Sequence, residues 1–379
     1  MNRKGFLILI ALLAVLGGAG LALFWQNLNA WRSTDAKAGA KLFAQIPVNT
    51  VTKIRLKDGK GEATLEIKDQ HWVVKQRVDY NASVQAIGDL LVKLPDVKVV
   101  QTETVGASLL PRLNLVDPAT DGKGGDSIGT RLELSDQGGK VVASVLLGKK
   151  VIKTEDSPLP IKPQTPVGRY VLSPGNPTVL VLSDALTNAE AAPERWLAKD
   201  FFKVDRIKSL TASGGASWKI ARNEEFGQWK FADGAGALDA GAAVAAVNAL
   251  AAPAFSDIAP EAKIEGLEKP RTITAETFDR LTYTVRLGQK AGGDDYNLAF
   301  TVRGEPARER VPEKNEKADE KARRDQQFAD DLKKLDARLK FEQSLAAWTY
   351  IVAGKTLAPL LKDRPQLIAA PRKPPVRQR

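Results

Sequence analysis

The sequence predicts an α+β protein with an N-terminal transmembrane helix, two repeated, mostly antiparallel β-sheet-plus-helix units and a long charged C-terminal helix. Three observations predict this: an uncharged stretch near the start, landmarks that recur in order, and a late charged stretch with a narrow apolar stripe. We expect six segments: a cytoplasmic n-region and transmembrane anchor (1–32), a linker (33–46), a first repeat (47–190), a second repeat (191–304), a charged helix and final segment (305–361), and a basic Pro-rich tail (362–379).

The N-terminal segment has the length and composition of an uncleaved signal anchor. The stretch from Phe6 to Trp25 carries no charge, and about twenty helical residues cross a hydrocarbon core of about 30 Å. Arg3 and Lys4 precede it, and basic residues favour the cytoplasmic side. We therefore expect a single-pass protein of the bacterial inner membrane, with its N-terminus cytoplasmic and its body periplasmic. The alternative is a cleaved signal peptide, whose apolar region is normally only about 7–15 residues long.

The first repeat combines strand patterns with one amphipathic helix. Runs of alternating apolar residues flank Asp58-Gly59, which is a hairpin turn signal. A helix is expected from about Ala82 to Leu94, and Pro95 ends it. Its predicted buried face consists of Val84, Ile87, Leu91 and Leu94, because these residues are spaced three or four apart. Further strands are expected near 97–103, 128–134, 141–147, 168–172 and 178–182.

Landmarks of the first repeat recur in the second in the same order. The matched pairs are Trp72 and Trp229, which are 157 residues apart, Pro118 and Pro270, 152 apart, and Gly148 and Gly288, 140 apart. The offsets shrink steadily, which indicates loops of different lengths within one conserved order of elements. The sequence therefore predicts a duplicated unit.

A long charged helix is expected after the second repeat. Residues 313–340 hold eight acidic and nine basic residues. Their pattern predicts a helix laced with salt bridges around a narrow apolar stripe, formed by Phe328, Leu332, Leu335 and Leu339. This stripe packs either on the protein's own domain, which we favour, or on a partner helix. Residues 348–352 are a candidate final strand.

Composition excludes several classes of site. The chain has no cysteine, so disulfides, thiolate metal sites and cysteine nucleophiles are excluded. His71 is the single histidine, which excludes a histidine-rich metal centre. The net charge of +11 lies at the ends: residues 1–60 carry +7 and residues 362–379 carry +5, so the rest is near neutral. This distribution argues against a nucleic-acid partner.

No residue is assigned a catalytic, cofactor-binding or metal-binding role, and no cofactor is expected. Strand alternation places His71 toward solvent if Trp72 faces the core. Asp294-Asp295 fits a hairpin loop better than a cation site. Gly354-Lys355-Thr356 lacks the earlier glycine of a phosphate-binding loop, because that position holds Thr349. Three tryptophans suit core packing better than a sugar platform: Trp72, Trp218 and Trp229.

The order of these features resembles the domain-of-unknown-function family 4340. The resemblance rests on the anchor, the Gln70-x-Trp72 strand, the helix, the Leu267-to-Pro270 turn and the late Trp348-Thr349-Tyr350 segment. It extends over most of residues 45–360. It implies association with ABC-type transport proteins or gliding-motility-type auxiliary proteins, and it brings no catalytic residues.

Taken together, the sequence predicts a non-catalytic, membrane-anchored extracytoplasmic accessory or scaffold subunit, with a membrane-protein partner in an ABC-type transport or envelope complex. Two alternatives from other classes remain open. One is an extracytoplasmic module that binds a glycan or lipid in a tryptophan-lined or apolar groove. The other is a carboxylate-dependent hydrolase, which needs two acidic side chains facing each other across a cleft.

Overall fold

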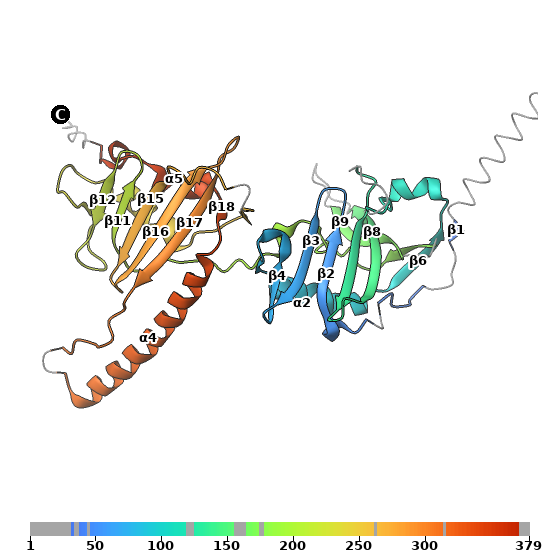
Figure 1. Cartoon of the computed structure of the whole chain (residues 1–379), viewed down its shortest axis with the longest axis horizontal. Coiled ribbons are helices and arrows are strands. Elements are labelled where there is room, and N and C mark those ends of the chain that lie inside the picture. Colours follow the sequence, from blue (N-terminus) through green and yellow to red (C-terminus); the bar gives the residue numbers. More distant parts are fainter. Residues whose placement is uncertain are drawn as a thin grey trace, which may run out of the picture. The chain divides into compact units, whose positions relative to one another are not determined.

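The computed structural model describes residues 32–33, 38–43, 46–118, 125–154, 164–173, 178–260, 264–313 and 316–370. The chain divides into two compact units, Met1–Ala198 (unit 1) and Lys199–Arg379 (unit 2). Each unit is α+β and is built on an antiparallel sheet with few helices (Figure 1).

Unit 1 contains a ten-stranded sheet in the order β1-β6-β10-β9-β8-β7-β2-β3-β4-β5. Within the described residues of unit 1, the α-helix α2 (Val84–Lys93) lies between β5 and β6 in the chain. The strands are β1 (Arg32–Ser33), β2 (Val51–Lys57), β3 (Glu62–Lys68), β4 (His71–Val74), β5 (Tyr80–Asn81), β6 (Val99–Thr104), β7 (Thr130–Asp136), β8 (Val141–Thr154), β9 (Gln164–Leu172) and β10 (Thr178–Leu182).

Unit 2 contains an eight-stranded sheet in the order β13-β12-β11-β15-β16-β17-β18-β14. Its strands are β11 (Ile207–Ser213), β12 (Trp218–Ala221), β13 (Lys230–Phe231), β14 (Asp257–Ile258), β15 (Arg271–Thr277), β16 (Leu281–Gln289), β17 (Asp295–Gly304) and β18 (Tyr350–Ala353). Its α-helices are α3 (Ala240–Ala251), α4 (Ala318–Leu345) and α5 (Gly354–Leu361).

The two sheets share one topology. Eight strands of unit 1 lie in the order β4-β3-β2-β7-β8-β9-β10-β6, and those of unit 2 lie in the order β13-β12-β11-β15-β16-β17-β18-β14. In chain order, each of these sets has three hairpin strands, a helix, one strand that ends the shared order and then four more strands. This correspondence pairs α2 with α3, β6 with β14 and β10 with β18, which agrees with the predicted duplication.

Two of the repeated landmarks, Gly148 and Gly288, are glycines because each lies against a loop. Asn114 (φ 53°) and Gly266 (φ 77°), which are 152 residues apart like the matched prolines, both adopt left-handed backbone. The loop at each residue lies directly against the matched glycine of the next strand pair. A Cβ on Gly148 would lie 2.5 Å from Leu113 O, and one on Gly288 would lie 2.4 Å from Gly266 C. The glycines therefore permit the close contact between loop and strand.

The face that α2 buries differs from the prediction. Ser83 caps the helix by accepting a hydrogen bond from Ala86 N at 3.2 Å. Ile87, Leu90 and the following Leu94 are buried, whereas Val84, which the spacing placed on the buried face, is 67% exposed. The prediction is thus correct for Ile87 and Leu94, while Leu90 is buried in place of Leu91, which is half-buried. A second, shorter stripe remains on the outside.

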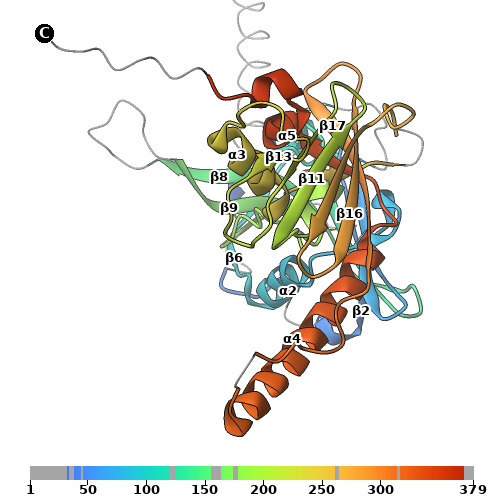
Figure 2. The same ribbon diagram turned by 90° about the vertical axis from the view of Figure 1, so that its left-hand side faces the viewer.

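The charged stretch of the sequence forms α4, which extends away from the sheet of unit 2 (Figures 1 and 2). Residues 305–313 run from β17 toward the start of this helix and are tied back to it by ion pairs. Arg308 pairs with Asp336 at 2.6 Å, and Arg310 pairs with Asp325 at 2.8 Å. We call residues 305–345 the arm. Its predicted apolar stripe is half-buried.

Among the residues that the structure describes, no helix combines the length and apolar character needed to cross a bilayer. The predicted anchor at residues 6–25 lies outside the described residues, as does the basic tail from residue 371 onward.

Candidate functional site

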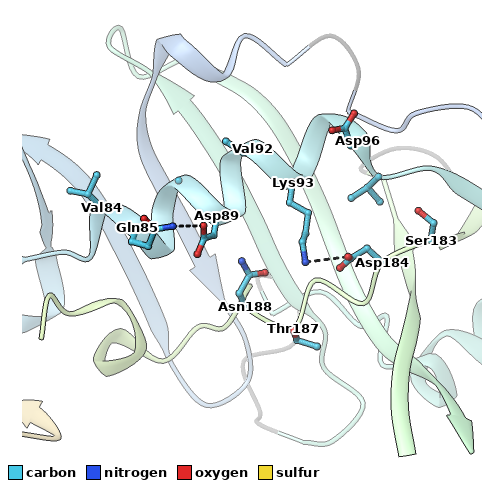
Figure 3. A pocket seen from close by; sticks show the side chains of 12 residues that line it. Val84, Gln85, Asp89, Val92, Lys93, Asp96, Ser183, Asp184, Thr187 and Asn188 are labelled. Atoms are coloured by element: carbon cyan, nitrogen blue, oxygen red, sulfur yellow. Dashed lines mark hydrogen bonds and ion pairs between the residues drawn. The ribbon is translucent and has the colours of Figure 1, made fainter. Parts of the chain in front are cut away.

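Unit 1 has a groove with a volume of about 840 Å³ along α2. Figure 3 shows its two walls, which are the exposed side of α2 and the loop that follows β10. The helix side contributes Val84, Gln85, Gly88, Asp89, Val92 and Lys93, followed by Asp96 and Val97. The loop side contributes Ser183, Asp184, Thr187 and Asn188. We call this the α2 groove.

The helix wall of the groove presents an apolar stripe to solvent. Val84, Gly88 and Val92 are spaced four apart and therefore lie on one side of α2. Val84 is 67% exposed and Val92 is 73% exposed. Nothing lies within 4 Å of the position that a Cβ on Gly88 would take. Two large apolar side chains thus flank an open spot where another backbone can approach closely.

Hydrogen bonds and ion pairs fix the polar rim of the groove. Asp89 accepts a hydrogen bond from Gln85 Nε2 at 2.7 Å. Lys93 Nζ lies 3.1 Å from Asp184 Oδ2, which joins the helix to the loop. Asp184 also accepts from Leu186 N at 2.7 Å and so holds the turn of that loop. These contacts set the width of the groove.

Two further polar groups mark the groove's ends and floor. Lys41 donates to Asp96 at 2.7 Å, and this hydrogen bond holds the pKa of the Asp96 carboxyl below its usual range. Asn188 Oδ1 is buried and has no hydrogen-bond partner in the described part of the chain. A buried acceptor without a donor is costly.

Unit 2 has a helix where unit 1 has the loop after β10. There the segment after the last strand, β18, forms α5, which packs against α3. Figure 2 shows α3 and α5 at the same end of unit 2. Leu357 and Leu360 of α5 are buried. In unit 1 the segment after the last strand, β10, is not helical in residues 183–188, and the groove lies between it and α2.

The helices α2 and α3 differ in the side chains at matching positions. Aligning the buried residues of the helices (Ile87 with Ala243, Leu90 with Ala246, Leu94 with Leu250) gives a constant offset of 156. Asp89 and Lys93 then correspond to Ala245 and Ala249. By the same offset Val84 and Gly88 correspond to Ala240 and Val244, which are exposed in unit 2, so α5 packs against another side of α3.

The groove does place two carboxylates, Asp89 and Asp184, on opposite walls (Figure 3). Each is already engaged locally, Asp89 by Gln85 and Asp184 by both Lys93 and Leu186 N. None of the groove's lining residues is aromatic. Within the described residues, no group of three or more histidine, cysteine, aspartate or glutamate side chains is arranged to hold a metal ion.

Unit 2 has a second polar cluster, at the base of the arm. Glu342 of α4 is 1% exposed and accepts hydrogen bonds from Tyr283 Oη at 2.6 Å and Lys203 N at 3.1 Å. Arg338 lies 3.2 Å from Glu342 and donates to Asp205 at 2.9 Å. Burial raises the pKa of Glu342, while the Tyr283 hydrogen bond and the Arg338 charge oppose that rise. Glu342 and Tyr283 are buried, so the cluster fastens the base of the arm to unit 2.

The residues considered from sequence are placed without a shared site. His71 is exposed in β4, and Asp294-Asp295 lies at the turn into β17. Gly354 begins α5, where its N–H donates to Asp294 O at 2.9 Å. Trp218 is buried, as core packing requires. Trp72 and Trp229 are half-buried, so the expected core role is correct for Trp218 only.

Arginines without an assigned role prove to be structural. Arg169 is buried, donates to Gly148 O at 2.9 Å and to Leu186 O at 3.2 Å, and burial lowers its pKa to about 10. Arg222 lies over the Trp229 ring, 4.8 Å from its centroid.

Sequence reasoning missed the α2 groove. The available signal was the second stripe formed by Val84, Gly88 and Val92. It was obscured because Val84 also fits the spacing of the buried stripe.

No family model, no curated protein and no solved structure matches the chain. The resemblance to the domain-of-unknown-function family 4340 therefore stays a prediction.

Proposed function

We propose that the protein is a non-catalytic, membrane-anchored extracytoplasmic accessory subunit that docks onto a membrane-protein partner, in an ABC-type transport or envelope complex. In this proposal the apolar N-terminal stretch anchors it in the bacterial inner membrane, and both units lie in the periplasm. The observation that carries the proposal is the exposed apolar stripe of α2 inside a groove. Exposed apolar surface bounded by polar groups is typical of interaction sites.

The chemistry of the groove supports docking over catalysis. A general acid and base need carboxylates that are free to exchange protons with a substrate. Asp89 and Asp184 are instead held by their own neighbours, and the Asp184–Lys93 pair helps to shape the wall. A sugar site normally uses aromatic stacking platforms, and the lining of this groove is aliphatic and polar.

The arm supports the same proposal independently. It extends from the sheet, and most of the α4 surface is exposed and charged of both signs. Only its base, around Glu342, is fastened into unit 2. Because α4 buries few of its side chains against unit 2, most of its surface is available for contact with a partner.

In-cell crosslinking of the full-length protein tests the proposal, with mass spectrometry of the captured membrane fraction and an anchor-only chain as control. We expect repeated capture of subunits of one membrane complex by the full-length chain alone. Equal capture by the anchor-only chain would refute docking through the body. Turnover of a glycan substrate that is lost in an Asp184→Asn variant would favour the hydrolase alternative instead.

A further inference from the structure

We infer that the free edge of β8 binds an extended segment of the partner as an added strand, in which two acidic residues flank two apolar ones. This inference rests on the proposed docking function and names a segment that such an accessory subunit binds. The edge belongs to the outer part of the β8–β9 hairpin, residues 149–154 and 164–168, which we call the ribbon.

The ribbon extends a hairpin that is much shorter in unit 2. In the strand order that the two sheets share, β8 and β9 correspond to β16 and β17. The hairpin of unit 2 closes directly after Gly288, because Lys290 N donates to Asp295 O at 3.0 Å. In unit 1, β8 continues from Gly148 to Thr154 before β9 returns, and Figure 2 shows this hairpin, in green, running outward. A short hairpin is therefore enough to build this sheet, and the ribbon is available for another purpose.

One edge of the ribbon has unpaired backbone groups. The neighbouring strand on that side, β7, begins at Thr130, which pairs with Leu147, so the rest of β8 pairs with β9 alone. Among the described residues, none makes a backbone hydrogen bond to residues 149–154 on that side. Alternate residues of an antiparallel strand direct their N–H and C=O groups away from the paired neighbour, and such a free row is where another strand can add. The β9 edge is interrupted by Pro166, which has no N–H.

The side chains along the free edge form a regular charge pattern. Lys150 and Ile152 alternate with Val151 and Lys153, so each face of the ribbon carries one lysine and one apolar residue. Ile152 is 44% exposed. The ribbon contains no acidic residue. Within the described part of the chain, Lys149, Lys150 and Lys153 have no ion pair, so their charges are available to a partner.

Cross-strand pairing converts this pattern into a partner sequence. Directly opposite side chains stabilise a strand pair when they are both apolar or carry opposite charges. A strand added along residues 150–153 therefore has the order acidic, apolar, apolar, acidic, and this order is the same in either strand direction. A flat bilayer would contact the lysine of one face only. A second copy of β8, paired antiparallel about Val151 and Ile152, would place Lys150 opposite Lys153, and like charges in that position destabilise the pair.

Site-specific photocrosslinking tests the inference in the full-length protein in its native membrane. The photoreactive residue p-benzoylphenylalanine replaces Lys149, an exposed residue beside the free edge, in one variant. In the control variant it replaces Lys140, an exposed lysine in the turn before β8. We expect position 149 alone to capture one protein, through a segment with the order acidic, apolar, apolar, acidic.

Further variants test charge and shape separately. The double substitution Lys150→Glu and Lys153→Glu should lower capture from position 149 about ten-fold or more, whereas Lys140→Glu should not change it. Exchanging the two acidic residues of the captured segment for lysine should restore capture by the double variant. Replacing residues 151–168 by the turn 291–294 of unit 2 should abolish capture without moving the urea midpoint of unit 1. The charge variants decide the question if this shorter chain is unstable.

The other outcomes separate this inference from the proposed function. Capture of lipid, of a second copy of this chain or of a segment without the expected order overturns the inference, as does capture that the double substitution leaves unchanged. If position 149 captures nothing while the full-length chain still captures a membrane complex that the anchor-only chain does not, the inference fails and the accessory role stands. If neither experiment captures a protein, both fail.

Discussion

Replacing Glu342 by alanine should release the base of the arm and destabilise unit 2. Glu342 is 1% exposed, and its carboxylate is the acceptor for Tyr283 Oη and Lys203 N. Each buried donor that loses its acceptor costs about 1–3 kcal/mol. Arg338 keeps Asp205, so it is not left as an unpaired charge. We therefore expect a loss of about 3 kcal/mol, at the low end for breaking a buried charged pair.

Urea unfolding of the full-length protein in detergent measures this change. Two compact units give two transitions, and the substitution should shift only that of unit 2. A loss of about 3 kcal/mol moves a midpoint by roughly 1–3 M urea at typical slopes. Asp331→Ala is the matched control, because that side chain is 60% exposed and pairs only with Lys334 on the same helix. Its effect should stay within about 0.5 kcal/mol.

The pH dependence gives a second test of the same group. Because burial raises the pKa of Glu342, the folded unit binds this proton more tightly than the unfolded chain does. Its contribution to stability is therefore fully present below the ordinary glutamate pKa of 4.5 and is lost as pH rises through the folded pKa. The difference in unfolding free energy between the native protein and Glu342→Gln should fall over that window. Equal unfolding of Glu342→Ala and Asp331→Ala would refute this account of the arm's base.

Three further predictions concern the sheets and the groove. Gly148→Ala and Gly288→Ala should each destabilise their own unit alone by about 1–3 kcal/mol, seen as a lower thermal unfolding temperature, since the added Cβ would meet backbone at 2.5 and 2.4 Å. Gly88→Ala should stabilise unit 1 by about 1 kcal/mol in urea unfolding, because it replaces glycine in an open helix interior. The Arg364 hydrogen bond lowers the pKa of Asp233 to about 2. The hydrogen bond between Arg364 and Asp233 should be present above pH 4 and lost as pH falls toward 2. In an NMR titration, Asp233→Asn should remove this pH dependence of the Arg364 signals.

The two antiparallel sheets could be predicted because several of the landmarks in the sequence are packing constraints. Gly148 and Gly288 lie against loops that leave no space for a side chain, so the same residue type stands at both positions. The turn between β3 and β4 shows another local constraint. Asp69 and Gln70 have left-handed backbone, and the register places Lys68 opposite His71. Local constraints of this kind are visible in a single sequence.

The groove and the arm's base depend on contacts between distant segments. Periodicity identified a helix near 82–94, but Val84 fits two different stripes, and only the sheet beneath α2 decides which is buried. Glu342 is one acidic residue in a highly charged stretch. Its burial depends on Tyr283, which is 59 residues away in sequence. Propensity and spacing contain no information about such partners.

The two units differ at corresponding places, and those places are the candidate interaction surfaces. In unit 1, β9 and β10 follow one another closely, whereas the matching strands β17 and β18 of unit 2 are separated by the whole arm. After the last strand, unit 2 covers its helix with α5, and unit 1 leaves the α2 groove open. Both units need the shared strand order to form a stable sheet. A partner-binding role explains why each copy also has a feature that the other lacks, because neither an open apolar groove nor a projecting charged helix is needed to fold the sheet.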